Sequence, residues 1–534
     1  MNKKFILYSV GKLLEIISFI LCVPAAIAIY ECRALPFPDL LLNPGVLGFL
    51  VAIPSAFCFG FMIKRIGNKA ITGTGIREGF AIVTFGWATL SLFGAIPVMV
   101  YLIAQYDHLS FYSIVRVFTD AYFEIMSGFS TTGATILTDI EAVPKGLLFW
   151  RSLTHWLGGM GIVTLAIAIL PVFGVASYQM FRGEVPGPTT EQLSPRLAQT
   201  AKILWVTYGF LTLAETGLLT IGGMSLFDAL CHSFATMATG GFSTKAASIA
   251  AYDSAFIQWV IIVFMFFAGM NFLIHFKVLR TGNFDIIKKN TEFHFYVGVL
   301  ALAVVIGVVV IMVQGMLPQE MIAESFRNQP LVGEALVTRV AAEAQKLESF
   351  PVMVRHVAFQ VVSITTTTGY CTADFDMWPN AIRYMLVVLM FFGGCAGSTG
   401  GGMKMIRIMI MLKAAGREIQ TMIQPRLIKS IKIAGEAIEE RQVSNVLGFI
   451  VLFVTSFAFF VFLMSFYIDD FTTAFTVVAA TICNIGPGLS GVGATESYAW
   501  IPLPGKWILT FCMLLGRLEI YTVFIAFSPI SWKK

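Results

Sequence analysis

Four short segments that carry glycine recur along the chain, each directly after an apolar stretch that is too short to cross a bilayer. They are Ser130-Thr131-Thr132-Gly133, Ala238-Thr239-Gly240-Gly241, Thr367-Thr368-Gly369-Tyr370 and Asn484-Ile485-Gly486-Pro487, and they lie roughly 110 to 130 residues apart. Glycine permits backbone conformations that a Cβ would oppose. The regular recurrence therefore predicts one structural unit used four times.

The composition places these segments in a membrane. Apolar residues make up 57% of the chain and charged residues 13%, whereas about a quarter of the residues of a soluble domain are charged. The eight cysteines form no Cys-x-x-Cys pair, so the sequence indicates neither a disulfide framework nor a zinc site. His232, inside one of the short apolar stretches, is expected to be a hydrogen-bonded interior residue rather than a metal ligand.

Stretches long enough to cross a bilayer surround the four segments. A helix needs about 20 mostly apolar residues to span the membrane core, and the sequence predicts ten spans, near residues 5–30, 40–63, 79–104, 147–175, 200–222, 254–279, 293–313, 380–412, 443–467 and 505–528. Shorter apolar stretches end at the glycine segments, near residues 112–129, 226–238, 353–366 and 470–483. We expect each to be a re-entrant pore helix.

The fold predicted from this repeat is an all-α polytopic membrane protein. Four pseudo-symmetric helix–pore helix–helix repeats surround a central pore, and two extra transmembrane helices precede them. The expected boundaries are 1–78 for the two-helix leader, 79–199 for the first repeat, 200–290 for the second, 291–442 for the third, with a long outer loop and a broken second helix, and 443–534 for the fourth.

Basic residues set the expected orientation. Most Lys and Arg, including the cluster from Lys404 to Arg441, lie on the side of the N-terminus. By the positive-inside rule both termini are cytoplasmic and the glycine loops face outward. The longest outer segment, near 314–352, is rich in Glu; a solvated surface helix is the plainer interpretation and a cation-attracting vestibule the alternative.

The residue types of the glycine segments suit a cation pathway. K⁺ passes a narrow pore when oxygens replace its water, and carbonyls do this without adding a fixed charge that would hold the ion too tightly. The partly negative C-termini of the pore helices point at the same centre, and Asp120, Asp228 and Asp470 are expected to cap the helix starts. The predicted potassium filter consists of Thr131, Thr132, Gly133, Ala238, Thr239, Gly240, Thr367, Thr368, Gly369, Asn484, Ile485 and Gly486.

A glycine-rich stretch interrupts the eighth predicted span. Each interior glycine costs a helix about 1 kcal/mol relative to alanine, and non-helical backbone is tolerated at membrane depth only inside protein or beside a water-filled cavity. A phosphate-binding loop is excluded because Met403 stands where its Lys is required, and a nucleophile elbow because Ala396 replaces its first glycine. We predict a gate on the cytoplasmic side of the filter, formed by Gly393, Gly394, Gly397, Ser398, Thr399, Gly400, Gly401 and Gly402.

Arg517 lies inside the last predicted span. An ionisable residue at membrane depth is costly unless it is paired or hydrated, so Arg517 is a functional candidate. The plain interpretation is an ion pair with Glu519, but residues two apart on a helix point in different directions. We expect Arg517 to donate to carbonyls of the glycine-rich stretch and to raise an electrostatic barrier to cations.

Together these motifs resemble the Trk/Ktr/HKT superfamily of potassium transporters, and within it the bacterial Trk uptake subunits. The resemblance covers nearly the whole chain and also rests on Trp156-Leu157-Gly158-Gly159-Met160-Gly161 and Gly516-Arg517-Leu518-Glu519-Ile520. It implies that the broken span is an intramembrane gating loop and that Arg517 lies beneath the filter. It also implies one filter glycine per repeat, at Gly133, Gly240, Gly369 and Gly486.

The resemblance further implies a setting and partners. It implies a homodimer in the bacterial inner membrane that binds a cytosolic, nucleotide-sensing regulatory ring of the TrkA type. K⁺ is the transported ion and the lipid bilayer the remaining partner, while neither a nucleic acid nor a bound organic cofactor is expected. Related plant sodium transporters carry serine at the first filter glycine, so Gly133 favours K⁺ over Na⁺.

Selective K⁺ uptake is the leading functional hypothesis, because an inside-negative potential contributes about 2.3 kcal/mol per charge per 100 mV. Symport of K⁺ with H⁺ or Na⁺ stays open, although the motifs identify no coupling residue. A membrane enzyme built on Glu124, His155 and His232 would leave the glycine repeat unexplained. A structural or sensory membrane protein that has lost conduction is the third alternative.

Overall fold

The computed structural model describes residues 1–67, 76–173, 197–314, 341, 343–344, 346–426, 429–433 and 436–533. Among these residues six helical segments are long and apolar enough to cross a membrane, and two of them, Lys3–Glu31 and Arg77–Ile103, each join two consecutive helices. Two further apolar helix pairs are bent by 101° and 113°. The strands β1 (Lys432–Ile433) and β2 (Glu436–Ala437) pair antiparallel in a small hairpin. The protein is thus an all-α, multi-span membrane protein, as predicted.

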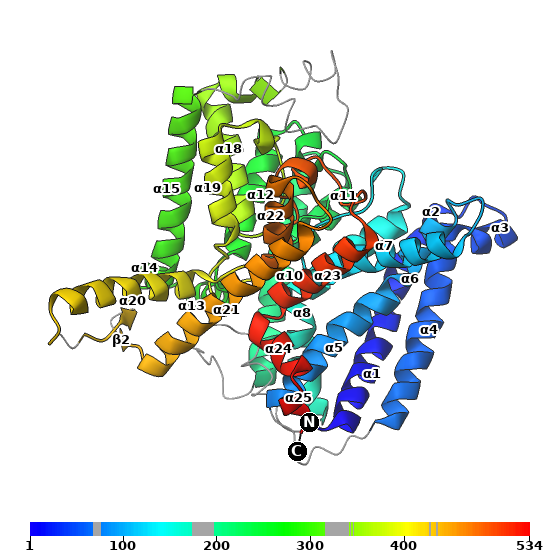
Figure 1. The fold of residues 1–534 in the computed structure, drawn as a ribbon. Coiled ribbons are helices and arrows are strands. Elements are labelled where there is room, and N and C mark those ends of the chain that lie inside the picture. Colours follow the sequence, from blue (N-terminus) through cyan, green and yellow to red (C-terminus); the bar gives the residue numbers. More distant parts are fainter. Residues whose placement is uncertain are drawn as a thin grey trace.

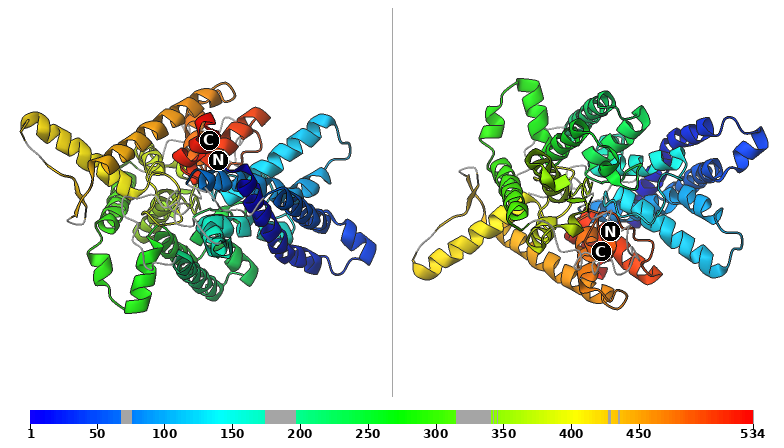
Figure 2. Two further views of the ribbon diagram at one scale, coloured as in Figure 1. Left: turned by 90° about the horizontal axis from the view of Figure 1, so that it is seen from below. Right: turned by 90° about the horizontal axis from the view of Figure 1, so that it is seen from above.

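The N-terminal leader consists of α1 (Lys3–Ile20), α2 (Cys22–Glu31), α3 (Phe37–Leu42) and α4 (Pro44–Ile66). The helices α1 and α4 pack closely because glycines face each other. A Cβ on Gly11 would come within 2.6 Å of the Gly60 carbonyl oxygen, and a Cβ on Gly60 within 2.8 Å of the Gly11 carbonyl oxygen. This pair packs against α5 (Ile76–Gly94) and α6 (Ile96–Ile103) of the first repeat, so the leader lies on the outside of that repeat (Figure 2).

Three kinds of helix recur in each repeat (Figure 1). The opening helices are α5 (Ile76–Gly94) with α6 (Ile96–Ile103), α10 (Leu197–Ile221), α15 (Thr291–Gln314) and α21 (Glu440–Met464). The pore helices are α7 (Phe111–Phe129), α11 (Leu226–Ala238), α18 (Phe350–Thr365) and α22 (Phe471–Ile482). The closing helices are α8 (Lys145–Phe173), α12 (Ala255–Ala268) with α13 (Phe272–Thr281), α19 (Asn380–Met390) with α20 (Met405–Ile423), and α23 (Leu503–Arg517) with α24 (Ile520–Phe527).

The four repeats follow one another around a common centre. Seen from above or below, the colours pass in chain order around the molecule, and the first repeat lies beside the fourth (Figure 2). The pore helices are buried toward their C-terminal ends, for example at Ile125, Met237, Ile364 and Ile482. All four therefore aim their C-termini into the protein interior.

The closing helix is broken in every repeat. Gly161 interrupts α8 with φ 60°, and α12 and α13 meet at 101°. Fourteen residues separate the end of α19 from the start of α20. The helices α23 and α24 meet at 113° around Glu519, whose φ is 60°. The sequence predicted only the break between α19 and α20. The spans predicted over 254–279 and 505–528 are bent helix pairs, each of which together has the length and composition of a span. They bend because Asn271 caps a new helix and Glu519 turns the chain.

Short elements connect these helices and close the chain. They are α14 (Asp285–Lys288), α25 (Pro529–Trp532) and the 3₁₀ turns Ser248–Ala251, Phe375–Met377 and Ser490–Val492. The two termini lie side by side, with the N-terminal amine donating to the Ser531 carbonyl over 3.4 Å (Figure 1). Most of the Glu-rich outer segment near 314–352 lies outside the described residues.

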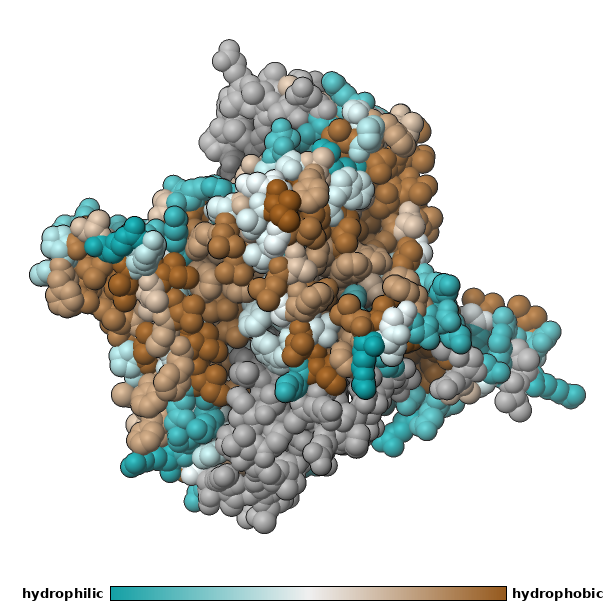
Figure 3. Space-filling model, turned by 180° about the vertical axis from the view of Figure 1, so that it is seen from behind, coloured by the Kyte–Doolittle hydropathy of each residue, from teal (hydrophilic) through white to brown (hydrophobic). Residues whose placement is uncertain are grey.

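Apolar side chains cover much of the flank of the molecule, as expected for contact with lipid. From behind, brown apolar surface extends over the flanks, and polar residues gather on the part that projects to the right (Figure 3). That projection is the far end of α20 with the hairpin, which points away from the body in Figure 1. Long apolar residues of α15 such as Leu302, Val309 and Val313 are exposed.

Candidate ion pathway

All four pore helices end in the same strained turn. One or two residues beyond the end of each helix, the backbone is left-handed, with φ between 53° and 60°, at Thr131, Thr239, Thr367 and Asn484. The next amide donates back to a carbonyl five residues earlier, over 2.8 to 2.9 Å, at Thr132, Gly240, Thr368 and Ile485. This is the hydrogen-bond pattern of a Schellman motif. A β-branched residue in the left-handed conformation costs on the order of 1–3 kcal/mol. Three of the four turns bear this cost, because they carry threonine at the left-handed position.

This shared turn fixes the register of the repeats and corrects one predicted residue. Counting two residues on from the left-handed position reaches a glycine with φ between 80° and 95° in each repeat, at Gly133, Gly241, Gly369 and Gly486. Gly241, not Gly240, is therefore the glycine equivalent to the other three. The sequence does not distinguish Gly240 from Gly241, because the two glycines are adjacent. Gly240 instead occupies the position of Thr132, Thr368 and Ile485.

The four glycines close a ring of contacts between neighbouring repeats. A Cβ on Gly133 would strike the carbonyl oxygen of Gly240, one on Gly241 that of Thr368, and one on Gly369 that of Ile485. A Cβ on Gly486 would come within 2.7 Å of the Thr132 carbonyl oxygen, which returns to the first repeat. Each of these positions must therefore be glycine, because a side chain would overlap a backbone carbonyl of the next repeat.

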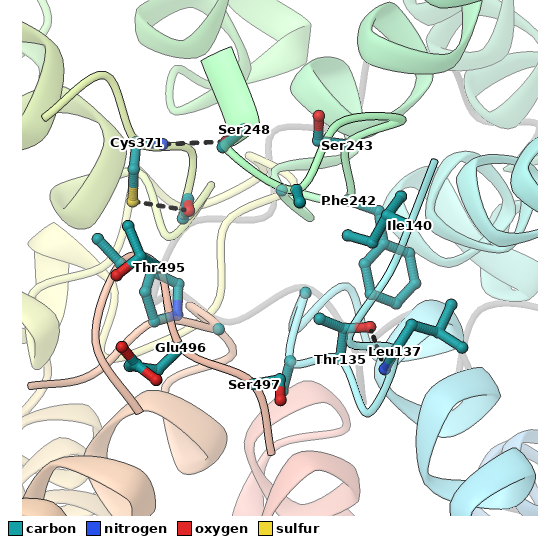
Figure 4. A pocket seen from close by; sticks show the side chains of 18 of the residues that line it. Thr135, Leu137, Ile140, Phe242, Ser243, Ser248, Cys371, Thr495, Glu496 and Ser497 are labelled. Carbon is teal, nitrogen blue, oxygen red and sulfur yellow. Dashed lines mark hydrogen bonds between the residues drawn. The ribbon is translucent and has the colours of Figure 1, made fainter. Parts of the chain in front are cut away.

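An open cavity of about 200 Å³ lies against this ring. The four glycines of the corrected register line it, together with Arg151, Lys245 and Glu496. Figure 4 shows that the labelled side chains come from the loops that follow the glycines, among them Thr135, Phe242, Cys371 and Glu496. The cavity is therefore a mouth shared by all four repeats, and we name it the outer mouth after the orientation that the basic residues predict.

Hydrogen bonds join the loops around this mouth. The Tyr498 amide donates to the Thr135 carbonyl over 2.8 Å and links the fourth repeat to the first. The Tyr370 hydroxyl donates to the Phe242 carbonyl over 3.2 Å and links the third to the second. These bonds join neighbouring repeats at two of the four boundaries around the ring.

The polar residues that begin the pore helices were predicted only in part. Asp470 caps α22, where it accepts from the amides of Thr472 and Thr473. Burial opposes its charge, but the bond from the Thr473 hydroxyl and then the amide bonds lower its pKa below the usual value. The caps of α7 and α11 are Ser110 and Ser225 instead. Asp120 was wrong as a cap because it lies in the middle of α7, where it accepts from Lys506 over 2.5 Å.

The glycine-rich stretch forms a compact loop beneath the filter turns. The Gly393 amide donates to the Met403 carbonyl over 2.7 Å, which closes the neck of the loop. The Gly401 amide donates to the Thr367 hydroxyl over 2.6 Å, and the Thr399 hydroxyl to the Met237 carbonyl over 2.9 Å. The loop of the third repeat is therefore bonded to filter turns or pore helices of the second and third repeats.

Arg517 crosses from the fourth repeat to this loop. One guanidinium nitrogen donates to the Thr399 carbonyl over 2.7 Å, and another to the Gly159 carbonyl over 2.8 Å and to the Gly158 carbonyl. The predicted contact between Arg517 and the glycine-rich stretch is thus present. The first, third and fourth repeats meet at this one side chain.

Two charged contacts near the loop were missed by sequence reasoning. Arg407 of α20 donates to Glu519 over 2.8 Å, so Glu519 has an ion-pair partner in the third repeat. The Lys404 ammonium donates to the Gly400 carbonyl inside the loop. The available signal was the position of Lys404 and Arg407 just after the glycines, at the start of a new helix.

The three residues considered for an enzyme serve separate structural contacts. Glu124 pairs with Arg151, and His155 bonds to the Gly128 carbonyl over 2.8 Å. His232 bonds to the Asp228 carbonyl over 2.7 Å and to the Ser243 hydroxyl over 2.9 Å. His232 is thus a hydrogen-bonded interior residue, as expected.

Residues 55–534 match the TrkH family, described as cation transport protein. The chain belongs to the TrkH family. It is 38% identical over 485 residues to the Trk system potassium uptake protein TrkH of Escherichia coli (strain K12), with 90% of this chain and 91% of that protein covered. It is 36% identical over 536 residues to the protein of the same name from Halomonas elongata, with 100% of both covered.

A solved structure agrees with the fold. The crystal structure of the potassium transporter TrkH from Vibrio parahaemolyticus matches with a TM-score of 0.79 and 32% sequence identity, covering 100% of both chains. Membership of the TrkH family makes the chain a transport protein rather than an enzyme. It also makes it a multi-pass protein of a bacterial Trk family.

Proposed function

We propose that this chain takes up K⁺ across the bacterial inner membrane through the ring of glycine and carbonyl contacts. The observation that carries the proposal is the closure of that ring: four equivalent glycines, each matched to a carbonyl of the next repeat. Relatives that align with nearly the whole chain carry the name potassium uptake protein. The filter residues are those predicted above, with Gly241 added in the position first given to Gly240.

The proposed chemistry uses backbone oxygens and helix ends. Carbonyl oxygens replace the water shell of K⁺ without a fixed charge. The pore helices end at the ring, so the partial negative charge of each C-terminus stabilises a cation there. The threonine and asparagine side chains at the turns are buried, and the side-chain amide of Asn484 joins the turns of the fourth and first repeats by donating to the Thr132 hydroxyl over 3.0 Å.

The proposed gate is the loop 393–402 together with Arg517. The loop lies at membrane depth under the turns, with Thr399, Gly400 and Gly401 buried. Arg517 holds it to the first repeat and places a positive charge beside it. In this state the loop and the guanidinium oppose the passage of K⁺, and opening requires the Arg517–Thr399 bond to break.

Orientation and partners complete the proposal. Both termini are cytoplasmic and the outer mouth faces outward, as the distribution of basic residues favours. The working unit is a homodimer that binds a nucleotide-sensing cytosolic ring, as the family resemblance implies. Uptake is driven by the membrane potential; symport with H⁺ or Na⁺ is the alternative.

Reversal potentials distinguish these two modes. Purified protein in a planar bilayer is exposed to a fixed K⁺ gradient while the pH or the Na⁺ concentration is changed on one side. For K⁺ uniport the reversal potential stays at the K⁺ equilibrium value. A reversal potential that moves with pH or Na⁺ supports symport, and one that ignores the K⁺ gradient contradicts potassium transport altogether.

A further inference from the structure

Glu124 and Arg151 form a buried ion pair behind the outer mouth. The Arg151 Nε donates to Glu124 Oε1 over 2.7 Å, and the two side chains are 2% and 0% exposed. Glu124 lies on the pore helix α7 and Arg151 on the closing helix α8. Neither belongs to the ring of carbonyls or to the loop beneath it.

The pair holds the segment that follows Gly133, the first filter glycine. Glu124 Oε2 accepts from the Ile136 amide over 2.8 Å, and Oε1 accepts from the Thr135 hydroxyl over 2.9 Å. Arg151 Nη2 donates to the same Thr135 hydroxyl over 3.1 Å. Since Thr135 follows Gly133 by two residues, this cluster fixes the outer side of the first filter turn.

Arg151 also reaches the second repeat. Its Nη1 donates to the Ser243 carbonyl over 3.5 Å, and its guanidinium carbon lies 4.1 Å from the centre of the Phe242 ring. Phe242 directly follows Gly241, and Arg151 lines the outer cavity. A permanent positive charge therefore stands at the mouth of a cation pathway, with the buried carboxylate of Glu124 as its counter-charge.

In two other repeats the residue at the equivalent pore-helix position also bonds to the loop that follows the filter turn, but its residue type differs. Seven residues before the left-handed turn, the four repeats carry Glu124, His232, Gln360 and Val477. His232 bonds to the Ser243 hydroxyl over 2.9 Å, and the Gln360 amide donates to the Ala373 carbonyl over 3.4 Å. Three of these four side chains thus bond to the loop segment that follows the filter turn of their own repeat. Glu124 is the charged member of this set.

We propose that Glu124 and Arg151 are a positioning pair that sets cation access and selection at the outer mouth. The Glu124 carboxylate offsets the positive charge that the Arg151 guanidinium presents to an approaching cation. The bonds of both side chains to Thr135 keep the first and second filter turns at a fixed distance from each other. The proposal rests on the proposed potassium pathway. Removing one partner of a buried pair leaves an uncompensated charge, whereas removing both does not.

The test measures ⁸⁶Rb⁺ uptake into liposomes as a function of external Rb⁺, and its competition by K⁺ and Na⁺. Glu124→Gln is expected to raise the apparent KM by about tenfold or more, which corresponds to ~1.4 kcal/mol of repulsion, with a smaller effect on the maximal rate. The double variant E124Q/R151Q is expected to return the KM to near that of the unchanged chain. Both variants lose part of the preference for K⁺ over Na⁺, because Thr135 loses its tether.

A conservative variant and a control complete the design. Glu124→Asp keeps the charge with a shorter reach, so its KM stays near normal while its preference for K⁺ falls. Asp107→Asn removes an exposed carboxylate from the loop before the same pore helix and is expected to change neither quantity. If Glu124→Gln does not yield monodisperse protein, the double variant and Glu124→Asp decide the question by themselves.

Three results would overturn the proposal: an unchanged KM in folded Glu124→Gln, a double variant with a KM as high as the single one, or an unchanged K⁺ preference in Glu124→Asp. A merely structural role predicts that the double variant is at least as impaired as the single one. Failure of the potassium pathway itself is distinguishable, because the unchanged chain in the same liposomes, with the regulatory ring added, would then show no uptake that K⁺ competes.

Discussion

Gly369 and Ile485 meet across the boundary between the third and fourth repeats, where a Cβ on the glycine would strike the isoleucine carbonyl oxygen. The same contact recurs at the other three boundaries. A side chain at any of these glycines must displace a backbone carbonyl that belongs to the next repeat. Under the proposed function, selectivity is therefore a property of the closed ring and not of one loop.

Serine at the first filter glycine is expected to weaken selection. In Gly133→Ser the new Cβ strikes the Gly240 carbonyl oxygen and meets a backbone with φ 81°, which disfavours side chains. We expect the K⁺ to Na⁺ permeability ratio to fall about tenfold, equivalent to ~1.4 kcal/mol. Bi-ionic reversal potentials measure it. An unchanged ratio in folded protein would remove Gly133 from the filter.

The corrected register makes a separate prediction in the second repeat. Gly241→Ser is expected to lower the K⁺ to Na⁺ ratio as Gly133→Ser does, because its Cβ would strike the Thr368 carbonyl oxygen. A Cβ on Gly240 instead meets the His155 ring at 2.5 Å, so Gly240→Ala is expected to lower the thermal midpoint more than it lowers the ratio. The reverse pattern would restore Gly240 as the filter glycine.

Removing the guanidinium beneath the filter is expected to increase flux. Arg517→Ala loses the bonds to Thr399 and Gly159 and removes the positive charge, so we expect ⁸⁶Rb⁺ uptake to rise about tenfold, equivalent to ~1.4 kcal/mol. Arg280→Ala, at an exposed position in the last turn of α13, is the matched control and leaves uptake unchanged. Equal or lower uptake in folded Arg517→Ala would contradict the barrier.

Acid is expected to stabilise the protein through Asp376, which is buried in the loop between α18 and α19. Burial and then the nearby Asp374 raise its pKa to about 7. Because the folded-state pKa exceeds the unfolded value of about 3.9, its stabilising contribution is full below about pH 4 and is lost as the pH rises to about 7.

The thermal midpoint should therefore be higher at pH 5.5 than at pH 8, and Asp376→Asn should reduce that difference. Other groups also titrate in this range, so the comparison between the two proteins carries the test. An identical pH dependence in both would show that Asp376 does not contribute.

Sequence reasoning reached the repeat and the pore helices because hydrophobic length and recurring glycines are local signals. The predicted stretch 226–238 coincides with α11 (Leu226–Ala238), and the contact of Arg517 with the glycine-rich loop followed from the cost of a charge at membrane depth. The register at Gly241 depends on a left-handed turn at Thr239, a conformation that threonine rarely adopts and composition does not signal.

The breaks in the closing helices were hidden for a related reason. An apolar run of sufficient length looks the same whether it crosses the membrane straight or bends, and Asn271 and Glu519 are single residues that turn the chain. The pair of Glu124 and Arg151 depends on a contact between residues 27 apart in sequence. Only the packing of α7 against α8 brings these two side chains together.

The most direct test is ⁸⁶Rb⁺ uptake into liposomes that contain the purified chain, with K⁺, Na⁺ or Li⁺ added in turn as competitors. A ring of carbonyls matched to K⁺ predicts that K⁺ blocks uptake at much lower concentration than Na⁺ or Li⁺, with the regulatory ring added where the gate is closed. Uptake that Na⁺ blocks as well as K⁺, or no uptake even with the regulatory ring present, would contradict the potassium filter.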